Sequence, residues 1–373
     1  MREFLTAVNR QKEGIWRYAD LLPEVGTEHQ ITMGEGGTPL IASRRIAAEL
    51  GLSSLYFKLE GSNPTGSYKD RISALGVSRA LQRGRVGCIG TSSGNAGASA
   101  AAYAARAGLP YALLVLEQIA ETKLMQAALH DAQIIKVKGF GTSAEVGDRV
   151  FRFIEEQAES LDREVMITAF RYNPVAMEAV KTIAFELLEK FGEKLPDAVF
   201  APVGGGGLFT GIWKGFKELH DRQWIGRMPL MAAVQSEGCS NIARAWQAGD
   251  DRPAPGDSTS GISGLQVPNP PDGELVLKGL KEDGGFAVAV SDEEAWAWQE
   301  RLAAEEGIWC EPAAAVSLAG VKRALDEGRL TPGGSAVCIL TGAGYKDVQR
   351  GQAMLRAKSE IPLLGMDELI STL

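Results

Sequence analysis

Histidine and cysteine are scarce in this chain of 373 residues, which contains three of the former and four of the latter. The histidines are too scattered to form a closely spaced metal cluster, although one of them could still act as a base. The cysteines are separated by at least 28 residues and never form a Cys-x-x-Cys pair, the spacing typical of zinc and dithiol sites. We therefore expect no metal site, and reduced thiols in a cytoplasmic protein.

Long hydrophobic runs and an excess of positive charge are also absent. No run of about 18 apolar residues occurs, and the first residues lack the apolar segment of a signal peptide, so we expect no membrane association. The net charge is −8, with 39 Lys and Arg against 47 Asp and Glu, which argues against nucleic acid as a partner. The expected partner is a small molecule.

Short apolar segments alternate with longer amphipathic segments along most of the chain. This pattern is typical of βαβ units around a mostly parallel sheet, so the sequence predicts an α/β protein. The predicted strands are 54–59, 86–90, 111–116, 133–137, 198–202, 230–235, 286–290 and 336–340. The predicted helices are 70–82, 96–107, 143–160, 174–191, 209–219, 292–306 and 312–327. Residues 249–273 carry five Pro and five Gly and are predicted to be an irregular segment, either functional or disordered.

Glycine is abundant, with 44 residues, and several glycines directly follow predicted strands, where open α/β sheets bind their ligands. One run follows the strand at 198–202 and leads into a helix; it consists of Gly204, Gly205, Gly206 and Gly207. Its amide groups and the helix dipole suit a phosphate, while a merely flexible connection is the alternative. The run matches neither the ATP-binding loop nor the dinucleotide fingerprint, which disfavours ATP and NAD.

A second loop places small polar residues at the start of an alanine-rich helix. It contains Ser92, Ser93, Gly94, Asn95 and Ala96, and eight of the twelve residues from 96 to 107 are alanine. The positive end of such a helix suits a carboxylate, whereas plain N-capping would explain one of these side chains but not all of them.

Two further positions complete a possible site. Lys69 lies in the first turn of a predicted helix, where a cation opposes the helix dipole, so a solvated lysine makes poor use of the position. A lysine there is suited to act as a Schiff-base amine and as a base, although by itself a surface lysine remains the simpler interpretation. Thr341 directly follows the predicted strand at 336–340 and places a hydroxyl at the same sheet edge.

Together these motifs and their order resemble the tryptophan-synthase-β-like family of pyridoxal-phosphate enzymes, also called fold type II, and within it the threonine synthases. The resemblance extends from about residue 34 to 350. It rests on GEGGTPL at 34–40, KLE at 58–60 and the segment to Arg71, SGN at 93–95 and the segment to Gly108, QSEGC at 235–239, GIWCEPA at 307–313 and LTGAGYKD at 340–347.

The resemblance implies two domains, each an open, mostly parallel sheet flanked by helices, with the active site between them. Residues 1–82 and 171–373 would form a large cofactor-binding domain, and residues 83–170 a small inserted domain with the substrate-carboxylate loop. It also implies pyridoxal 5'-phosphate as the cofactor, an amino acid as the substrate, and a homodimer.

The resemblance assigns roles to the residues that match the family's motifs. Lys69 would hold the cofactor as an internal aldimine and move protons, Asn95 would bind the phenolic oxygen, and residues 204–207 the phosphate. Thr341 would face the pyridine nitrogen, which favours elimination and replacement over transamination. The substrate's α-carboxylate would be bound by the loop at residues 92–96.

Two segments depart from the threonine synthases, which hold the substrate's phosphate with a lysine in Pro-x-Gly-Lys and with Asn, Ser and Arg in Asn-Ser-x-Asn-Pro-x-Arg. Here Gln118 replaces the lysine, and Phe170, Arg171 and Ala176 replace the other three. Fewer donors weaken phosphate binding, each charge-assisted hydrogen bond being worth about 1.5–3 kcal/mol. Arg171 remains a candidate for binding a substrate anion.

We therefore expect a threonine-synthase-like lyase that eliminates or replaces a side-chain group of an amino acid other than O-phosphohomoserine. Three alternatives stay open: a true threonine synthase, a serine or threonine ammonia-lyase, and a non-catalytic protein that binds the cofactor as a sensor. The glycine run resembles that of the serine and threonine dehydratases more than that of the threonine synthases.

Overall fold

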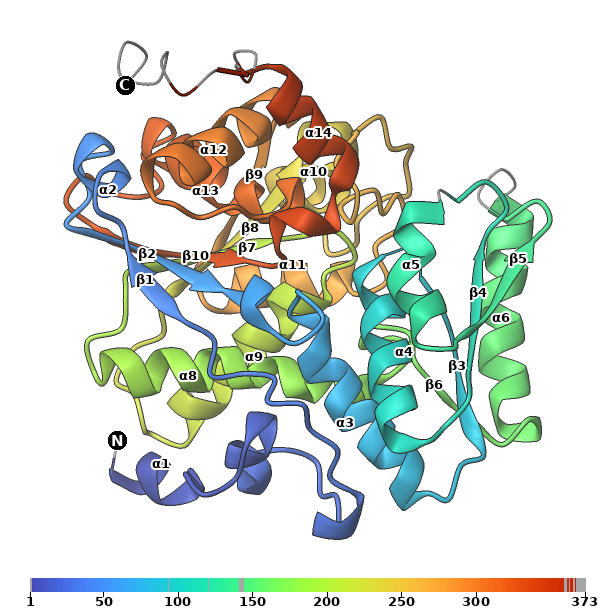
Figure 1. Ribbon diagram of the computed structural model, residues 1–373. Helices are drawn as coiled ribbons and strands as arrows, with labels where there is room; N and C mark the ends of the chain where they lie inside the picture. The colour runs from blue at the N-terminus through green and yellow to red at the C-terminus, as the bar shows by residue number, and fades with distance from the viewer. Residues whose placement is uncertain are drawn as a thin grey trace.

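Two separate sheets, each flanked by helices, form the protein (Figure 1). The structure is a computed structural model that describes residues 2–92, 94–119, 121–140, 144–358, 361, 363–364 and 366. The larger sheet has the strand order β1-β2-β10-β7-β8-β9, and the smaller sheet has the order β5-β4-β3-β6. In sheet order the strands are β1 Leu40–Ala42, β2 Ser54–Leu59, β10 Ser335–Leu340, β7 Ala198–Pro202, β8 Leu230–Ser236 and β9 Phe286–Val290; and β5 Gln133–Val137, β4 Tyr111–Leu116, β3 Gly87–Thr91 and β6 Arg163–Val165.

Alternate residues of the larger sheet bury their side chains against helices on opposite faces. Val199 and Ala201 of β7 pack in one core cluster with α8 and α9, whereas Ala198 and Phe200 pack in another with α12 and α13. All strand pairs in this sheet are parallel except β1 with β2. Because both faces are covered, β7 in the middle of the sheet is apolar throughout, as expected for a parallel sheet between helical layers.

The smaller sheet is parallel and is also covered on both faces. Leu113 of β4 packs with α4 and α5, while Leu114 packs with Val150 and Ile154 of α6. We call this sheet with α4, α5 and α6 the small unit. Its four strands lie within the predicted inserted range 83–170, and the domain boundaries themselves stay a prediction.

Helices connect most of the strands. The α-helices are α1 Arg2–Ala7, α2 Ile46–Glu49, α3 Lys69–Gln82, α4 Asn95–Ala107, α5 Glu121–Leu129, α6 Ala144–Ser160, α7 Pro174–Met177, α8 Thr182–Phe191, α9 Gly207–Asp221, α10 Asn241–Ala248, α11 Gly273–Glu282, α12 Asp292–Glu305, α13 Pro312–Asp326 and α14 Val348–Arg356. The 3-10 helices are η1 Gly14–Leu21, η2 Thr27–His29, η3 Glu60–Ser62, η4 Glu178–Lys181, η5 Glu237–Cys239 and η6 Gly344–Lys346.

The prediction of an α/β protein with parallel sheets is confirmed, and all eight predicted strands are present within one residue at either end. The short strands β1 and β6 were not predicted, because three residues are too few to show a periodicity. The helix predicted over 174–191 is divided by η4, and the helix predicted from 209 begins at Gly207, inside the glycine run. Six further helices were not predicted, namely α1, α2, α5, α10, α11 and α14.

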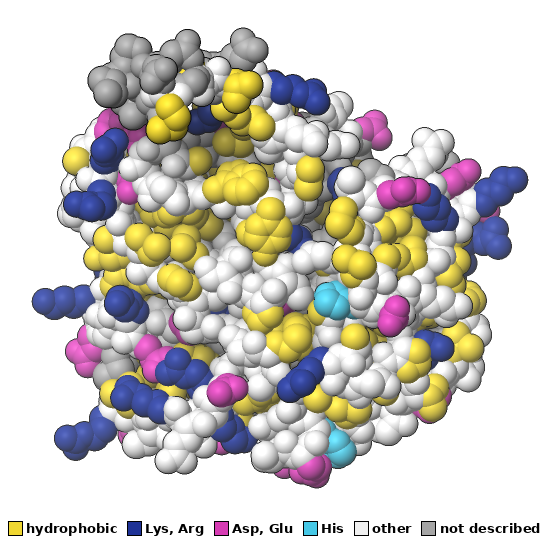
Figure 2. Space-filling model, viewed as in Figure 1, with side chains coloured by type: hydrophobic (Ala, Val, Ile, Leu, Met, Phe, Trp, Pro, Cys, Tyr) yellow, Lys and Arg dark blue, Asp and Glu magenta, His cyan; other side chains and the backbone are white. Residues whose placement is uncertain are grey.

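Charged side chains of both signs are interspersed on the surface, as Figure 2 shows for one face. None of the helices in the described part of the chain is long and apolar enough to cross a membrane. The described residues also contain no group of three or more His, Cys, Asp and Glu that could hold a metal ion.

A buried ion cluster anchors the helix that begins at Lys69. The guanidinium of Arg71, which is fully buried, donates to both oxygens of Glu60 at 2.8 Å and to Glu186 on α8. Lys58 on β2 donates to the second oxygen of Glu186 at 2.5 Å. Two cations and two carboxylates thus neutralise one another in the interior, where an unpaired charge would be very costly.

Removing the guanidinium should strongly destabilise the fold. Arg71→Leu leaves Lys58 as the one cation paired with Glu60 and Glu186 among the described residues, so we expect the free energy of unfolding to fall by about 3–5 kcal/mol, as for other broken buried ion pairs. Denaturant unfolding measures this difference. Arg252→Ala, which removes an exposed pair with Glu274, is the control and should change the free energy by less than about 1 kcal/mol. Similar losses in the two variants would contradict the role of the cluster.

The same cluster predicts a loss of stability in acid. Burial opposes ionisation of Glu186, but Arg71 and Lys58 outweigh it and lower its pKa from 4.5 to about 2. Because the folded-state pKa is the lower one, this stabilisation is complete above the unfolded pKa and disappears as the pH falls toward 2. In denaturant unfolding as a function of pH, the stability difference between wild type and Glu186→Gln should therefore shrink below about pH 4.5. A constant difference would contradict this assignment.

Candidate active site

The predicted site residues come from loops that follow neighbouring strands. The glycine run follows β7 and Thr341 follows β10, and these two strands are paired in parallel. The small unit contributes the loop between β3 and α4 and the residues after β6, and these strands are also paired in parallel. Carboxyl ends of parallel strands lie at one edge of a sheet, so each sheet presents its loops together.

Lys69 is half-buried, and its amine is near the glycine run. Its Nζ donates a hydrogen bond to Thr168 Oγ1 at 2.8 Å. The carbonyl oxygen of Thr168 lies 3.4 Å from the position of a Cβ at Gly207, so Thr168 is located between the amine and the glycines. Thr168 was not predicted, because a lone threonine after a three-residue strand gives no pattern in the sequence.

The loop before Lys69 is hydrogen-bonded to the loop that contains Thr341. The amide of Tyr68 donates to the carbonyl of Thr341 at 3.1 Å, and Ser67 forms an isolated bridge with Gly342. Asp70 folds back over the same turn and accepts from the amide of Thr65 at 2.7 Å. These contacts fix the backbone of Lys69 relative to the end of β10.

The glycine run needs its glycines for close approach to other backbone segments. Gly206 has φ +100°, in the left-handed region, and a Cβ there would lie 2.9 Å from Val276 and 3.0 Å from the backbone of Asp272. A Cβ at Gly204 would lie 2.6 Å from the carbonyl oxygen of Gly264. The segment 249–273, which is irregular from residue 250 to 272 as predicted, therefore packs directly on the run.

Asn95 and Thr341 are brought together by a third residue, Glu311. Asn95 Nδ2 donates to Glu311 Oε2 at 2.9 Å, and Thr341 Oγ1 donates to Glu311 Oε1 at 2.8 Å. Burial raises the pKa of Glu311, while the hydrogen bonds from Asn95 and Thr341 and the charge of Lys346 lower it less. Glu311 lies in a motif of the family resemblance, but nothing in the sequence indicated its contacts.

The remaining predicted residues differ in their surroundings. Ser92 is half-buried and its Oγ accepts from the amide of Gly94 at 3.2 Å, while Ala96 is buried in the first turn of α4. Ser93 lies outside the described residues. Arg171 is exposed, with its guanidinium 5.8 Å from the ring centre of Tyr172, and it has no hydrogen bond to another predicted site residue described in the structure.

The carboxylate of Asp272 holds the segment in which the sequence departs from the threonine synthases. It accepts from the amides of Phe170 at 2.9 Å and Arg171 at 3.0 Å, and its own amide donates to the carbonyl of Gly205 at 2.9 Å. Burial raises the pKa of Asp272, against the opposing effect of those two amides and of Lys69. Asp272 was missed because its partners are about 100 residues away in the sequence.

The donor set fits pyridoxal phosphate. It contains a primary amine at Lys69, a run of glycine amides at the start of α9, and hydroxyls near both. Ser67 Oγ and Thr210 Oγ1 are buried and have no hydrogen-bond partner among the described residues. Because buried hydroxyls are normally hydrogen-bonded, unpartnered ones beside Lys69 and in α9 are consistent with a site for a polar ligand.

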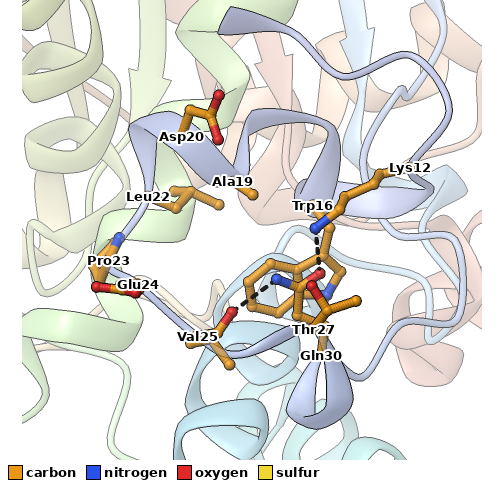
Figure 3. A pocket seen from close by; sticks show the side chains of 10 residues that line it. All are labelled: Lys12, Trp16, Ala19, Asp20, Leu22, Pro23, Glu24, Val25, Thr27 and Gln30. Carbon is orange, nitrogen blue, oxygen red and sulfur yellow. Dashed lines mark hydrogen bonds between the residues drawn. The ribbon is translucent and has the colours of Figure 1, made fainter.

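A pocket of about 380 Å³ lies elsewhere, in the N-terminal segment between Lys12 and Gln30 (Figure 3). Two of its polar side chains are engaged, since Lys12 Nζ donates to Gln30 Oε1 at 2.9 Å and Gln30 Nε2 donates to the carbonyl of Val25 at 2.8 Å. No predicted site residue lines this pocket.

Two helix-flanked parallel sheets, with a lysine at a helix start and a glycine run after a strand, define the fold type II class of α/β enzymes. Residues 31–342 match the family model described as "Pyridoxal-phosphate dependent enzyme", and the chain belongs to this family. The family uses pyridoxal phosphate, so the predicted cofactor is confirmed, as is the prediction of an enzyme of the lyase class.

Several relatives are threonine synthases, as the sequence resemblance predicted. The one from Methanocaldococcus jannaschii is 38% identical over 359 residues, which cover 95% of this chain and 85% of that protein. The one from Halalkalibacterium halodurans is 35% identical over 332 residues, which cover 88% of each chain. The protein is thus a threonine-synthase-like member of its family.

Solved structures with the same fold include other enzymes. The threonine deaminase isoform 2 of Solanum lycopersicum matches with a TM-score of 0.72 and 18% identity, covering 94% of this chain and 96% of that one. Maize serine racemase matches with a TM-score of 0.70 and 21% identity, covering 86% and 92%. At these identities the likeness shows the fold alone.

Substitution of Gly206 should weaken cofactor binding. In Gly206→Ala the left-handed backbone becomes strained and the new Cβ meets the backbone of Asp272, so we expect the dissociation constant for pyridoxal phosphate to rise about tenfold or more, equivalent to about 1.4 kcal/mol. An absorbance titration of the apoprotein measures it. Gly226→Ala, where nothing lies within 4 Å of the new Cβ, is the control. Equal affinities in the two variants would contradict the role of the run.

Proposed function

We propose that the protein catalyses elimination or replacement of a side-chain group of an amino acid other than O-phosphohomoserine. Lys69 would carry the cofactor through Nζ, residues 204–207 would bind the cofactor's phosphate, and Asn95 and Thr341 would face its ring. The observation that carries this proposal is the position of the Lys69 amine, 2.8 Å from Thr168 and next to the glycine run.

Bound pyridoxal phosphate supplies an electron sink that is conjugated with the α-carbon of an amino acid. The protein has to place a base at that carbon and to fix the amino acid in one orientation. Lys69 Nζ is the proposed base, which takes the α-proton once the amine is free. Thr168 accepts a hydrogen bond from this amine, which would limit the directions in which it can point.

The start of α4 is the proposed site for the substrate's carboxylate. The first amide groups of a helix have no partner within the helix, and the helix dipole favours an anion there. The amides of Asn95 and Ala96 in this loop would bind the carboxylate, whereas the amide of Gly94 already donates to Ser92 Oγ. The side chain of Asn95 is directed toward Glu311 and the end of β10. Arg171 is exposed, so we propose for it only a contact with the solvent-facing part of the substrate.

The surroundings of the two segments that differ from the threonine synthases support a leaving group other than a phosphate. Phe170 and Ala176 are buried, and Gln118 is exposed. The amides of Phe170 and Arg171 already donate to Asp272, so they are not free for a substrate oxygen. A phosphate dianion would therefore find fewer donors here than in the segment it meets in threonine synthases.

Threonine synthesis from O-phosphohomoserine is the second candidate. Its support is the identity of 34–38% with threonine synthases over most of the chain. An ammonia-lyase acting on serine or threonine is a further alternative, whereas membership of the enzyme family disfavours the non-catalytic sensor. The homodimer and the cytoplasmic location also stay predictions.

One experiment separates these candidates. The holoenzyme is mixed separately with O-phosphohomoserine, serine, threonine, O-phosphoserine and O-acetylserine, and the products are identified. We expect turnover to be fastest with a substrate that is not O-phosphohomoserine. Fastest release of phosphate with formation of threonine would overturn the proposal in favour of the second candidate, and no turnover with any amino acid would overturn it as well.

The role of Lys69 has its own test. Borohydride reduction of the holoenzyme should attach the cofactor covalently to the peptide that contains Lys69, as seen by mass spectrometry, and Lys69→Ala should abolish both attachment and turnover. Lys322→Ala, on the exposed surface of α13, is the control and should leave both unchanged. Attachment at another lysine would contradict the assignment.

A further inference from the structure

Glu311 is a buried carboxyl in the candidate site to which the proposed reaction gives no part. It is the residue before α13, and its two oxygens accept hydrogen bonds from Thr341 at 2.8 Å and from Asn95 at 2.9 Å. Asn95 belongs to the small unit, whereas Thr341 follows β10 of the larger sheet. One carboxyl group thus joins the two side chains proposed to face the cofactor's ring.

The backbone around Glu311 holds the carboxyl group in this position. The amide of Glu311 donates to the carbonyl of Gly342 at 3.0 Å, and Cys310 forms an isolated bridge with Ala343. A Cβ at Gly342 would lie between 2.6 and 2.9 Å from the carboxyl atoms of Glu311. Only glycine at this position leaves room for the carboxyl group between Asn95 and Thr341.

The titratable groups that act on Glu311 come from its own segment and from the loop after β10. Lys346 of η6 favours its ionised form, Asp347 disfavours it, and Cys310 is the adjacent thiol. Asp70 of α3 acts in turn on Lys346. Among the described residues no cation forms an ion pair with Glu311, in contrast to Glu60 and Glu186. Burial, the largest effect, raises its pKa.

We propose that Glu311 is a positioning residue, which orients Asn95 and Thr341 toward the cofactor and whose proton sets the hydrogen-bond direction at Thr341. The inference rests on the proposed function, from which it takes the roles of Asn95 and Thr341. It adds a titratable group that acts on the ring through a hydroxyl.

The hydroxyl group of Thr341 carries a single proton, which it can donate to only one partner at a time. When Glu311 is ionised, Thr341 donates its proton to Oε1 and offers only lone pairs to the ring nitrogen. When Glu311 is protonated, it donates to Thr341 Oγ1, and the hydroxyl proton of Thr341 becomes free for the ring nitrogen. The proton of Glu311 comes from solvent and returns to it, and no other bond changes.

Asn95 is oriented by the same carboxyl group. Its amide nitrogen carries two protons, and one of them is donated to Glu311 Oε2. The second proton is left for the cofactor's phenolic oxygen. This bond to Glu311 also distinguishes the amide nitrogen from the amide oxygen, so Asn95 presents a donor and not an acceptor.

Glu311→Gln tests the proposal. Glutamine can donate to Thr341 and accept from Asn95, as the protonated acid does, but it cannot titrate. The absorption spectrum of the bound cofactor is followed from about pH 5 to about pH 9 in wild type and variant. We expect the midpoint of the spectral titration to disappear or to move by about one pH unit or more in the variant, while thermal unfolding of the apoprotein changes little. An unchanged midpoint overturns the proposal.

Glu35→Gln is the matched control, because Glu35 is also buried and its pKa is also raised by burial. Glu35 accepts from Tyr103 of α4 at 2.8 Å and from the amide of Ile15, and it has no hydrogen bond to Asn95 or Thr341. This variant should titrate like wild type, and an equal shift in both variants overturns the proposal. If Glu311→Gln does not fold, Glu311→Asp, whose shorter carboxyl is drawn away from Thr341, has to move the midpoint instead.

Failure of the proposed function would look different. It would appear in the wild type itself, as borohydride attachment away from Lys69 or as no turnover of any amino acid. A wild type that binds the cofactor through Lys69 and turns over an amino acid, together with a Glu311→Gln variant of unchanged midpoint, would overturn the role of Glu311 alone.

Discussion

The guanidinium of Arg71 joins three parts of the chain, one of which lies 115 residues further along the sequence. Arg71 lies on α3, Glu60 follows β2, and Glu186 lies on α8 beyond the whole small unit. Because a buried charge without partners is so costly, these segments can pack together only in an arrangement in which each of the buried charges has its partner. Lys69 is two residues before Arg71 on α3. The cluster therefore also fixes the backbone position from which the candidate catalytic amine extends.

A second group of carboxyls in the site follows a different electrostatic pattern. Glu60 and Glu186 are paired with cations, and their pKa values are lowered despite burial. Glu311 and Asp272 are held by amide and hydroxyl donors, and burial raises their pKa values. The paired carboxyls anchor the fold, whereas the unpaired ones lie beside Thr341 and the glycine run, where a bound cofactor would be. This separation is typical of sites in which proton transfer matters.

Local patterns were sufficient for much of the fold and for part of the site. Strands of five or more residues and the alanine-rich helix α4 follow from periodicity and composition, whereas the close contacts of the glycine run with residues 264 and 272 do not. The three-residue strands β1 and β6 and the break of the helix over 174–191 depend on packing between distant segments. Thr168, Asp272 and Glu311 were missed for the same reason, since each acts through a partner about 30 to 220 residues away.

Residue types and their order are enough to define the class of this protein: the order of its loops and the position of Lys69 indicate a fold type II enzyme that uses pyridoxal phosphate. They also show which residues of the threonine synthases are replaced. The folded structure is needed to see that Arg71 is wholly buried between two carboxylates, that Asp272 engages the amides of Phe170 and Arg171, and that Glu311 joins Asn95 to Thr341. Hydrogen bonds and burial depend on which segments meet in space, and that is settled only when the two sheets have packed.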